Sequence, residues 1–162
     1  MAEHTIRPAR ADDVETIVAL IGELAEYEKL GHEVVAGPES IRLHLFGPSP
    51  RAEAILAEVD GRPVGFALFF HNFSTFLGRP GMYLEDLFVR PAHRGTGIGR
   101  SLLAALAKVA HERGCGRLDW AVLDWNEPAQ AFYKSIGARP VDDWTIYRLD
   151  ADAMRALAGA GR

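Results

Sequence analysis

Nonpolar side chains recur every three or four residues in several stretches of the chain, a spacing that places them on one face of a helix. Behind Asp12 and Glu15, which have the spacing of a capping box, this pattern continues to Lys29. A second strongly amphipathic stretch lies between Gly97 and Gly114. The pattern predicts helices over residues 12–29, 38–45, 98–112 and 127–136.

Shorter nonpolar runs, separated by glycine, proline and aspartate, predict strands. Asp60-Gly61 between two such runs is typical of a tight antiparallel hairpin. The glycines and proline of residues 78–81 predict a loop, and the strand, helix and strand over 82–123 should form a parallel unit with a right-handed crossover. The predicted strands cover residues 4–7, 52–59, 63–71, 82–89, 117–123, 139–141 and 144–149, and a frayed tail follows them.

This order of elements predicts one α/β (α+β) domain over residues 1–162 with a mixed sheet. The composition, 48% hydrophobic and 25% charged, supports a globular core. The longest nonpolar run, residues 64–70, is far too short to span a bilayer, and the first residues lack the pattern of a secretory signal. We therefore expect a cytoplasmic protein.

Charge and cysteine content narrow the classes of function. With 18 basic and 22 acidic side chains the net charge is −4, a poor match for nucleic acid or anionic membranes but compatible with a cationic substrate. The single cysteine, Cys115, excludes an internal disulfide framework and a multi-cysteine zinc site. The six histidines lack metal-ligand spacing, so we expect no metal.

The most informative stretch is Arg94-Gly95-Thr96-Gly97-Ile98-Gly99-Arg100, which follows a predicted strand and opens a predicted helix. Glycines let the backbone turn tightly and approach a ligand, and the free N–H groups of a helix's first turn suit a phosphate. The stretch lacks the Lys-Ser/Thr of a Walker A loop and the context of a dinucleotide fingerprint. A turn that serves only geometry is the alternative interpretation.

This motif, Arg94-x-x-Gly97-x-Gly99, resembles the acetyl-coenzyme A pyrophosphate motif of the GNAT N-acetyltransferases. The chain is similar over nearly its whole length to the diamine acetyltransferases (spermidine/spermine N-acetyltransferase) and their thialysine-acetylating relatives. The resemblance rests on five further motifs: Ile6-Arg7-Pro8-Ala9, Glu23-Leu24-Ala25-x-Tyr27-Glu28, Tyr83-Leu84-Glu85-Asp86, Trp125-Asn126-Glu127-Pro128 and Phe132-Tyr133-Lys134. It implies the GNAT fold, whose central mixed, largely antiparallel sheet is flanked by helices and splayed after residues 82–89.

The resemblance also implies acetyl-coenzyme A as co-substrate and a set of residues that would hold it. The strand backbone would pair with the pantetheine arm and stabilise an oxyanion, the glycine loop would hold the pyrophosphate, and the 126–129 region would contact coenzyme A further along. These residues are Leu87, Phe88, Val89, Arg94, Gly95, Thr96, Gly97, Ile98, Gly99, Arg100, Asn126, Glu127, Pro128, Ala129 and Tyr133.

For catalysis the resemblance implies Glu85 and Tyr133. An alkylamine must lose a proton before it attacks a thioester, and Glu85 would accept that proton through water, while the phenol of Tyr133 would protonate the leaving thiolate. Because Glu85 and Asp86 alternate on a predicted strand, we expect only one of them to face the cleft, and favour Glu85. Without the resemblance, the preferred interpretation of Tyr133 is a core aromatic residue on a short helix, like Phe132 beside it.

The implied amine site departs from the family in several places, which leaves the polyamine specificity open. Ser74 and Phe76 stand where the diamine enzymes carry an acid and a tryptophan, and the acidic loop near the C-terminus is shortened. Without the resemblance, Glu28 reads as an ordinary solvent-exposed helix end. The implied amine-site residues are Tyr27, Glu28, Ser74, Phe76, Glu85, Asp86, Asp119, Trp120 and Asp143.

The predicted function is acetyl transfer to a primary amine of a small cationic metabolite, by direct attack without a covalent enzyme intermediate. The partners expected are a small-molecule amine and, from the family, a second copy of the chain as a homodimer. Two alternatives stay open. One is a GNAT enzyme that acetylates a protein N-terminus or lysine, and the other is a non-catalytic acyl-coenzyme A sensor.

Overall fold

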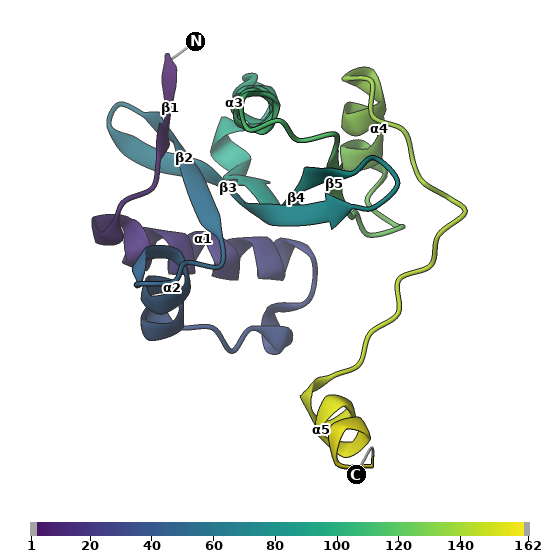
Figure 1. Ribbon diagram of the computed structural model, residues 1–162. Helices are drawn as coiled ribbons and strands as arrows, with labels where there is room; N and C mark the ends of the chain where they lie inside the picture. The colour runs from purple at the N-terminus through teal and green to yellow at the C-terminus, as the bar shows by residue number, and fades with distance from the viewer. Residues whose placement is uncertain (1–2, 161–162) are drawn as a thin grey trace. The chain divides into compact units, whose positions relative to one another are not determined.

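The computed structural model describes residues 3–160. These residues form two units, one ending at Leu123 and the other beginning at Asp124, and each unit is described by itself. The first unit is a five-stranded sheet with helices on both faces (Figure 1). Its elements are β1 (His4–Pro8), α1 (Val14–Tyr27), α2 (Pro38–Phe46), β2 (Glu53–Val59), β3 (Arg62–Ser74), β4 (Arg79–Val89), α3 (Ile98–Glu112) and β5 (Leu118–Trp120), with short 3-10 turns at Ala11–Asp13, Gly31–Glu33 and Pro91–His93.

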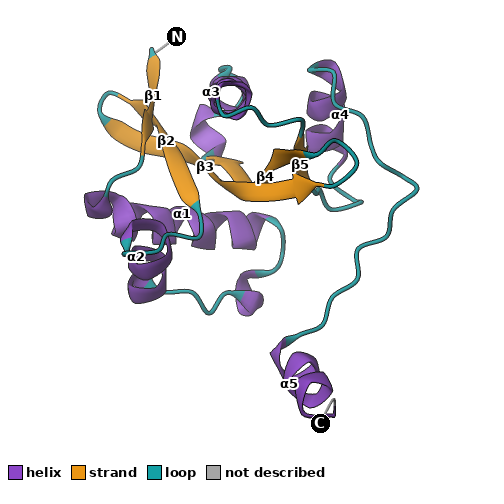
Figure 2. Cartoon of the chain, in the orientation of Figure 1, coloured by secondary structure: helices purple, strands orange, loops and turns teal. Residues whose placement is uncertain are grey.

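The strands lie in the sheet in their sequence order, β1 to β5 (Figure 2). The three pairings from β1 to β4 are antiparallel, and β4 pairs with β5 in parallel. The predicted mixed sheet, its hairpin and its parallel unit are therefore confirmed. At the hairpin, Asp60 and Gly61 both have positive φ, 50° and 73°, as a two-residue turn of this kind requires.

Helices α1 and α2 cover one face of the sheet, and α3 covers the other (Figure 1). The core on the α1 face joins nonpolar side chains from both helices to those of β2, β3 and β4. Its members are Ile17, Leu20, Leu24, Leu45, Ala54, Leu56, Phe66, Leu68 and Phe88. Since alternate residues of a strand share a face, this core fixes which side chains of β3 and β4 point toward α1.

A network of charges fastens β1 to the start of α1. Both terminal nitrogens of Arg7 donate to the carboxylate of Asp13, at 2.8 and 2.9 Å, and its Nε donates to Glu58 at 2.7 Å. The Arg10 backbone N–H also donates to Asp13, at 2.7 Å. The hydrogen bond from Arg7 holds the pKa of the Asp13 carboxyl below its usual value. Asp13, rather than the predicted Asp12, therefore organises this helix start.

Several elements begin or end at other residues than predicted, mostly because strand pairing extends further or stops earlier than the sequence pattern indicates. The predicted loop over 78–81 is wrong beyond Gly78, because Arg79 pairs with Ser74 and opens β4. The last strand of the sheet covers only Leu118–Trp120, since β4 pairs with it no further than Leu84. The first helix ends at Tyr27.

The second unit holds α4 (Glu127–Ser135) and α5 (Ala151–Ala160). The two strands predicted over 139–141 and 144–149 are wrong: the segment forms no ladder with any described residue. Residues 151–160 form a helix instead of a frayed tail, capped by Asp150, whose carboxylate accepts from the Ala153 N–H at 2.9 Å. Alanine, the strongest helix former, occupies half of that helix.

No helix among residues 3–160 combines the length and the hydropathy needed to cross a membrane.

Candidate active site

The C-terminal half of β4 has a strand partner on one side only. Its pairing with β5 covers Met82 to Leu84, whereas its pairing with β3 continues to Val89. Among the described residues, the backbone of residues 85–89 is therefore unpaired on the β5 side. This is the splay predicted for the sheet. An extended ligand can hydrogen-bond to such an edge as an added strand would.

A β-bulge at Glu85 changes the orientation of the side chains that follow it. Leu68 of β3 pairs with Asp86, but the next residue, Phe69, pairs with Leu84, so Glu85 is the extra residue of β4. Tyr83 lies opposite Phe70 and shares a face with Glu85 two residues on. Beyond the bulge, Asp86 lies opposite the core residue Leu68.

Both acidic side chains of β4 therefore point to the α1 face. The expectation that only one of Glu85 and Asp86 faces the cleft is wrong, because the bulge interrupts the alternation on which it depended.

Glu28, which follows the last residue of α1, completes a cluster of three carboxylates with Glu85 and Asp86. Burial, followed by the charges of Glu85 and Glu28, raises the pKa of the half-buried Asp86 carboxyl to about 6. Burial also raises the pKa of Glu28. No ion pair joins a cation to any of the three within the described part of the chain. The arrangement concentrates negative charge and suits an incoming ammonium group.

The glycine-rich stretch leads from β4 into α3 as predicted. Gly95 and Gly97 have φ of 75° and 89°, in the left-handed region where a side chain is strained. Gly97 is the N-cap of α3, and no acidic residue lies in the first turn of that helix. Helix N-termini leave backbone N–H groups without helical partners and carry partial positive charge, so this one suits an anion.

Arg94 lies between the glycine loop and the end of α1. Its Nε donates to the Val89 carbonyl at 2.8 Å, and its guanidinium carbon lies 4.6 Å from the centre of the Tyr27 ring and 5.4 Å from that of Phe88. These contacts orient the loop against β4 and α1. Tyr27, predicted for the amine site, is thus joined to the predicted cofactor loop.

Sequence reasoning missed an aromatic pair beside Glu85. The rings of Phe70 and Tyr83 have centroids 5.3 Å apart, and both side chains are half-buried. Burial, followed by the charges of Glu85 and Asp119, raises the pKa of the Tyr83 phenol. Tyr83 therefore lies near both carboxylates. The sequence could have indicated this, because Tyr83 precedes Glu85 by two residues on a predicted strand and so shares its face.

Two of the predicted amine-site residues lie far from this cluster. Ser74 and Phe76 belong to the tip of the β3–β4 hairpin, where Ser74 pairs with Arg79. Arg79 precedes Glu85 by six residues along β4, so the hairpin tip with Ser74 and Phe76 lies about 20 Å from Glu85. Ser74 is buried and accepts from the Leu77 N–H at 3.1 Å, and Phe76 is 95% exposed. Within this chain, Ser74 and Phe76 therefore do not lie beside the carboxylate cluster.

The predicted residues of β5 are divided between the faces of the sheet. Asp119 lies opposite Tyr83, on the side of Glu85, and pairs with Arg117 at 3.1 Å. Trp120 lies opposite the buried Leu84 and points to the other face.

Within the second unit, the remaining candidates lie on α4 and in the segment that follows it. The buried Asn126 caps this helix, its side-chain oxygen accepting from the Ala129 N–H at 3.3 Å, and Glu127 and Pro128 form its first turn. Tyr133 lies on the same helix, with its ring 5.6 Å from that of Phe132. Asp143 lies in an exposed turn of the segment that follows.

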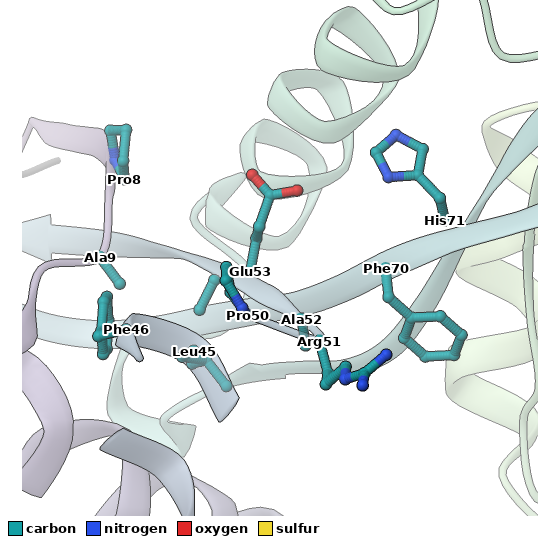
Figure 3. A pocket seen from close by; sticks show the side chains of 11 residues that line it. Pro8, Ala9, Leu45, Phe46, Pro50, Arg51, Ala52, Glu53, Phe70 and His71 are labelled. Carbon is teal, nitrogen blue, oxygen red and sulfur yellow. The ribbon is translucent and has the colours of Figure 1, made fainter. Parts of the chain in front are cut away.

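A hollow of about 430 Å³ lies at the start of β2, beside the part of β3 that extends past its last pair with β2 (Figure 3). Phe70 lines it together with Arg51, Glu53 and His71. None of the residues predicted for the active site lines the hollow, but its lining residue Phe70 packs against Tyr83.

Comparison with known proteins agrees with this geometry. Residues 21–138 match the acetyltransferase (GNAT) family. A thialysine N-epsilon-acetyltransferase of Bos taurus is 41% identical, covering 98% of this chain and 99% of its own. An L-ornithine N5-acetyltransferase of Arabidopsis thaliana is 32% identical, covering 94% of this chain and 86% of its own. An integron cassette protein from V. cholerae superimposes with a TM-score of 0.80 and 30% identity, covering 98% of each chain.

Proposed function

The chain belongs to the GNAT family of acetyltransferases and is an N-acetyltransferase, and we propose that it acetylates a primary amine of a small cationic metabolite. The acceptor class comprises diamines, polyamines and thialysine-like amino acids. The names of the relatives, which act on thialysine and ornithine, support a small amine.

The observation that carries this proposal is the cluster of Glu28, Glu85 and Asp86. A protonated amine is a cation, and the cluster offers it three carboxylates without a protein counter-cation among the described residues. With a pKa of about 6, Asp86 is mostly ionised at neutral pH and attracts the amine. A small cation supplies the charge that this cluster lacks.

The residues present fit acetyl-coenzyme A. The unpaired backbone of residues 85–89 can hold an extended arm, and the first turn of α3, free of acidic residues, can hold a pyrophosphate. We assign the arm to Leu87, Phe88 and Val89, and the pyrophosphate to the 94–100 loop. Asn126 to Ala129 would contact the cofactor further along, an assignment that rests on the family resemblance.

The bound co-substrate would supply an acetyl thioester. Glu28 and Asp86 would hold the ammonium group, and Glu85, the most exposed of the three, would accept its proton through water. A backbone N–H of the 87–89 segment would stabilise negative charge on the carbonyl oxygen. The phenol O–H of Tyr133 would donate a proton to the departing sulfur.

We also propose that the chain acts as one domain over residues 1–162 and as a homodimer. The segment after α4 carries large nonpolar side chains that are more than half exposed and that a partner chain would cover. They are Val141, Trp144, Ile146, Tyr147 and Leu149.

The test is thiol release from acetyl-coenzyme A with separate amines: putrescine, spermidine, thialysine, lysine and a short peptide. We expect turnover with at least one small amine. The variant Glu85→Gln should lower kcat by roughly a hundredfold or more, because it removes the proton acceptor. Tyr133→Phe should lower kcat at saturating substrate by a similar factor.

Glu39→Gln, an equal change at the start of α2, is the matched control and should leave kcat unchanged. If none of the small amines reacts while acetyl-coenzyme A still binds, a protein acceptor or a sensor role replaces the proposal. Full turnover in Tyr133→Phe would remove that residue from the catalytic step.

A further inference from the structure

Arg94 begins the glycine-rich loop, but its guanidinium is held by protein groups on the α1 face of the sheet. Its Nε donates to the Val89 carbonyl at 2.8 Å, and its guanidinium carbon lies 4.6 and 5.4 Å from the ring centres of Tyr27 and Phe88. Phe88 belongs to the core between the sheet and α1, whereas α3 covers the opposite face (Figure 1). The guanidinium is therefore directed toward α1, and not toward the helix whose first turn suits a pyrophosphate.

The hydrogen bond from Arg94 closes the open edge of β4 at its last residue. The Arg90 N–H donates to the Val64 carbonyl at 2.8 Å, so these two residues form a hydrogen-bonded pair of the β3–β4 ladder. Such pairs alternate with non-hydrogen-bonded ones, so the N–H and C=O groups of Leu87 and Val89 point away from β3. With the Val89 carbonyl occupied, residues 87–89 offer an extended arm the N–H and C=O of Leu87 and the N–H of Val89.

The contact between Arg94 and Tyr27 joins this edge to the acidic cluster. Tyr27 is the last residue of α1, and the next residue, Glu28, contributes one of the three carboxylates. The Glu28 N–H donates to the Leu24 carbonyl at 2.9 Å, so the helical turn continues through Glu28 and ties its backbone to that of Tyr27. A guanidinium is planar and stacks on aromatic rings, so it can hold a ring and a carbonyl in one geometry.

We propose that Arg94 is a positioning residue that aligns the acetyl donor with the amine, and that its side chain does not bind the pyrophosphate. It acts through Val89, where the arm of the donor pairs, and through Tyr27, whose neighbour Glu28 holds the ammonium group. This rests on the proposed function and adds a coupling between the two substrates of the reaction. The pyrophosphate is left to the backbone N–H groups of the loop and of the first turn of α3.

Two acetyl donors separate positioning from phosphate binding: acetyl-coenzyme A, and S-acetylpantetheine, which has the same thioester arm but no pyrophosphate. The acceptor is the small amine that the wild-type protein uses best. Arg94→Met should lower kcat/KM by about tenfold with both donors, because it removes the stacked cation and the donor to Val89. At saturating acetyl-coenzyme A it should also raise the KM of the amine more than it lowers kcat. A loss confined to acetyl-coenzyme A, or an unchanged KM of the amine, would overturn the proposal.

A double-mutant cycle tests whether Arg94 acts through the ring of Tyr27. Tyr27→Leu removes the ring, and Tyr27→Phe keeps it. Because the two side chains act as one unit, the variant carrying Arg94→Met and Tyr27→Leu should be no worse than the more affected single variant, within about twofold. In the Tyr27→Phe background, Arg94→Met should keep its full effect on the KM of the amine. Losses that multiply in the double variant with Tyr27→Leu would refute the coupling.

Arg90→Met is the matched control, since Arg90 also joins the end of β4 to α1. Its Nε donates to Glu23 at 2.9 Å, one helical turn before Tyr27, and its terminal nitrogen donates to the Pro63 carbonyl at 3.1 Å. Both partners of this ion pair are partly exposed, and such pairs contribute little. We expect Arg90→Met to leave the KM values of both donors and of the amine within about twofold of wild type.

An effect of Arg90→Met as large as that of Arg94→Met would show that any loosening of α1 suffices, and would overturn the specific role of Arg94. Failure of the inference is distinguishable from failure of the proposed function. Absence of turnover with every small amine in the wild-type protein overturns both together. Wild-type turnover of a small amine that Arg94→Met leaves unchanged with both donors overturns the inference alone.

Discussion

Asp13 and Asp86 are aspartates held against the same sheet in opposite electrostatic surroundings. Asp13 receives two hydrogen bonds from Arg7 and one from the Arg10 backbone, which lowers its pKa. Asp86 is surrounded by Glu85 and Glu28, and burial with these charges raises its pKa to about 6. The first carboxylate is satisfied by the fold, and the second is left for a ligand to satisfy. The two can be separated by experiment.

The largest expected effect is on stability, at the satisfied carboxylate. Asp13→Ala should lower the free energy of unfolding by about 3 kcal/mol at pH 7, because it leaves part of the Arg7 guanidinium and the Arg10 N–H without partners. Urea denaturation measures this change. Asp12→Ala, at the neighbouring exposed position, should change stability by less than about 0.5 kcal/mol. Equal effects of the two variants would contradict the role given to Asp13.

The second expected effect is a gain in stability, at the carboxylate that the fold leaves without a partner. Asp86→Asn should raise the free energy of unfolding by about 2 kcal/mol at pH 7, because the ionised carboxylate is more costly in the folded chain than in the unfolded one. The same variant should lower kcat/KM for small amines at least tenfold. A variant that is both less stable and fully active would refute the contrast with Asp13.

The pH dependence of unfolding provides a control for the predicted stability gain of Asp86→Asn. Between pH 3.8, the ordinary pKa of an aspartate, and about pH 6, the folded Asp86 holds a proton that the unfolded chain has released. Stability from this group therefore falls as pH rises through that window, and the gain in Asp86→Asn should grow from near zero at pH 4 to its full value at pH 7. For Asp13, whose pKa is lowered, the stabilisation is present above about pH 4 and is lost as pH falls further.

The smallest expected effect is the stabilisation of the folded protein by a bound amine. Ornithine at ten times its Kd, with coenzyme A present, should stabilise the wild-type protein by about 1.4 kcal/mol. Asp86→Asn should lose most of this increment at the same concentration, and Asp12→Ala should keep it. Thermal unfolding with and without ornithine measures the difference. An increment of equal size in Asp86→Asn would show that this carboxylate does not hold the amine.

The parts of the fold that were predictable are those set by local patterns. The helix over 98–112, the hairpin at Asp60-Gly61 and the order of the sheet follow from periodicity and turn chemistry within a few residues. The strands predicted over 139–149 failed because a strand exists only where another strand pairs with it, and pairing is not a local property. Among the described residues, no strand pairs with that segment.

The sequence supplied candidate residues for the site, but not their arrangement in space. The bulge at Glu85 depends on the register between β3 and β4, and the sequence of β4 alone gives no sign of it. That register brings Asp86 beside Glu85 and leaves Ser74 and Phe76 at the far end of the hairpin.

The one-sided pairing of β4 also has a consequence for how the protein behaves in concentrated solution. A strand edge with open N–H and C=O groups is a template on which another chain can add a strand, and proteins usually guard such edges. If coenzyme A pairs with residues 85–89 as proposed, each release of the cofactor uncovers them again. The carboxylates of Glu85 and Asp86 at the start of this edge act as gatekeepers, because a neighbouring chain would have to bury them. The charges that we propose to recruit the substrate would thus also protect the protein from aggregation.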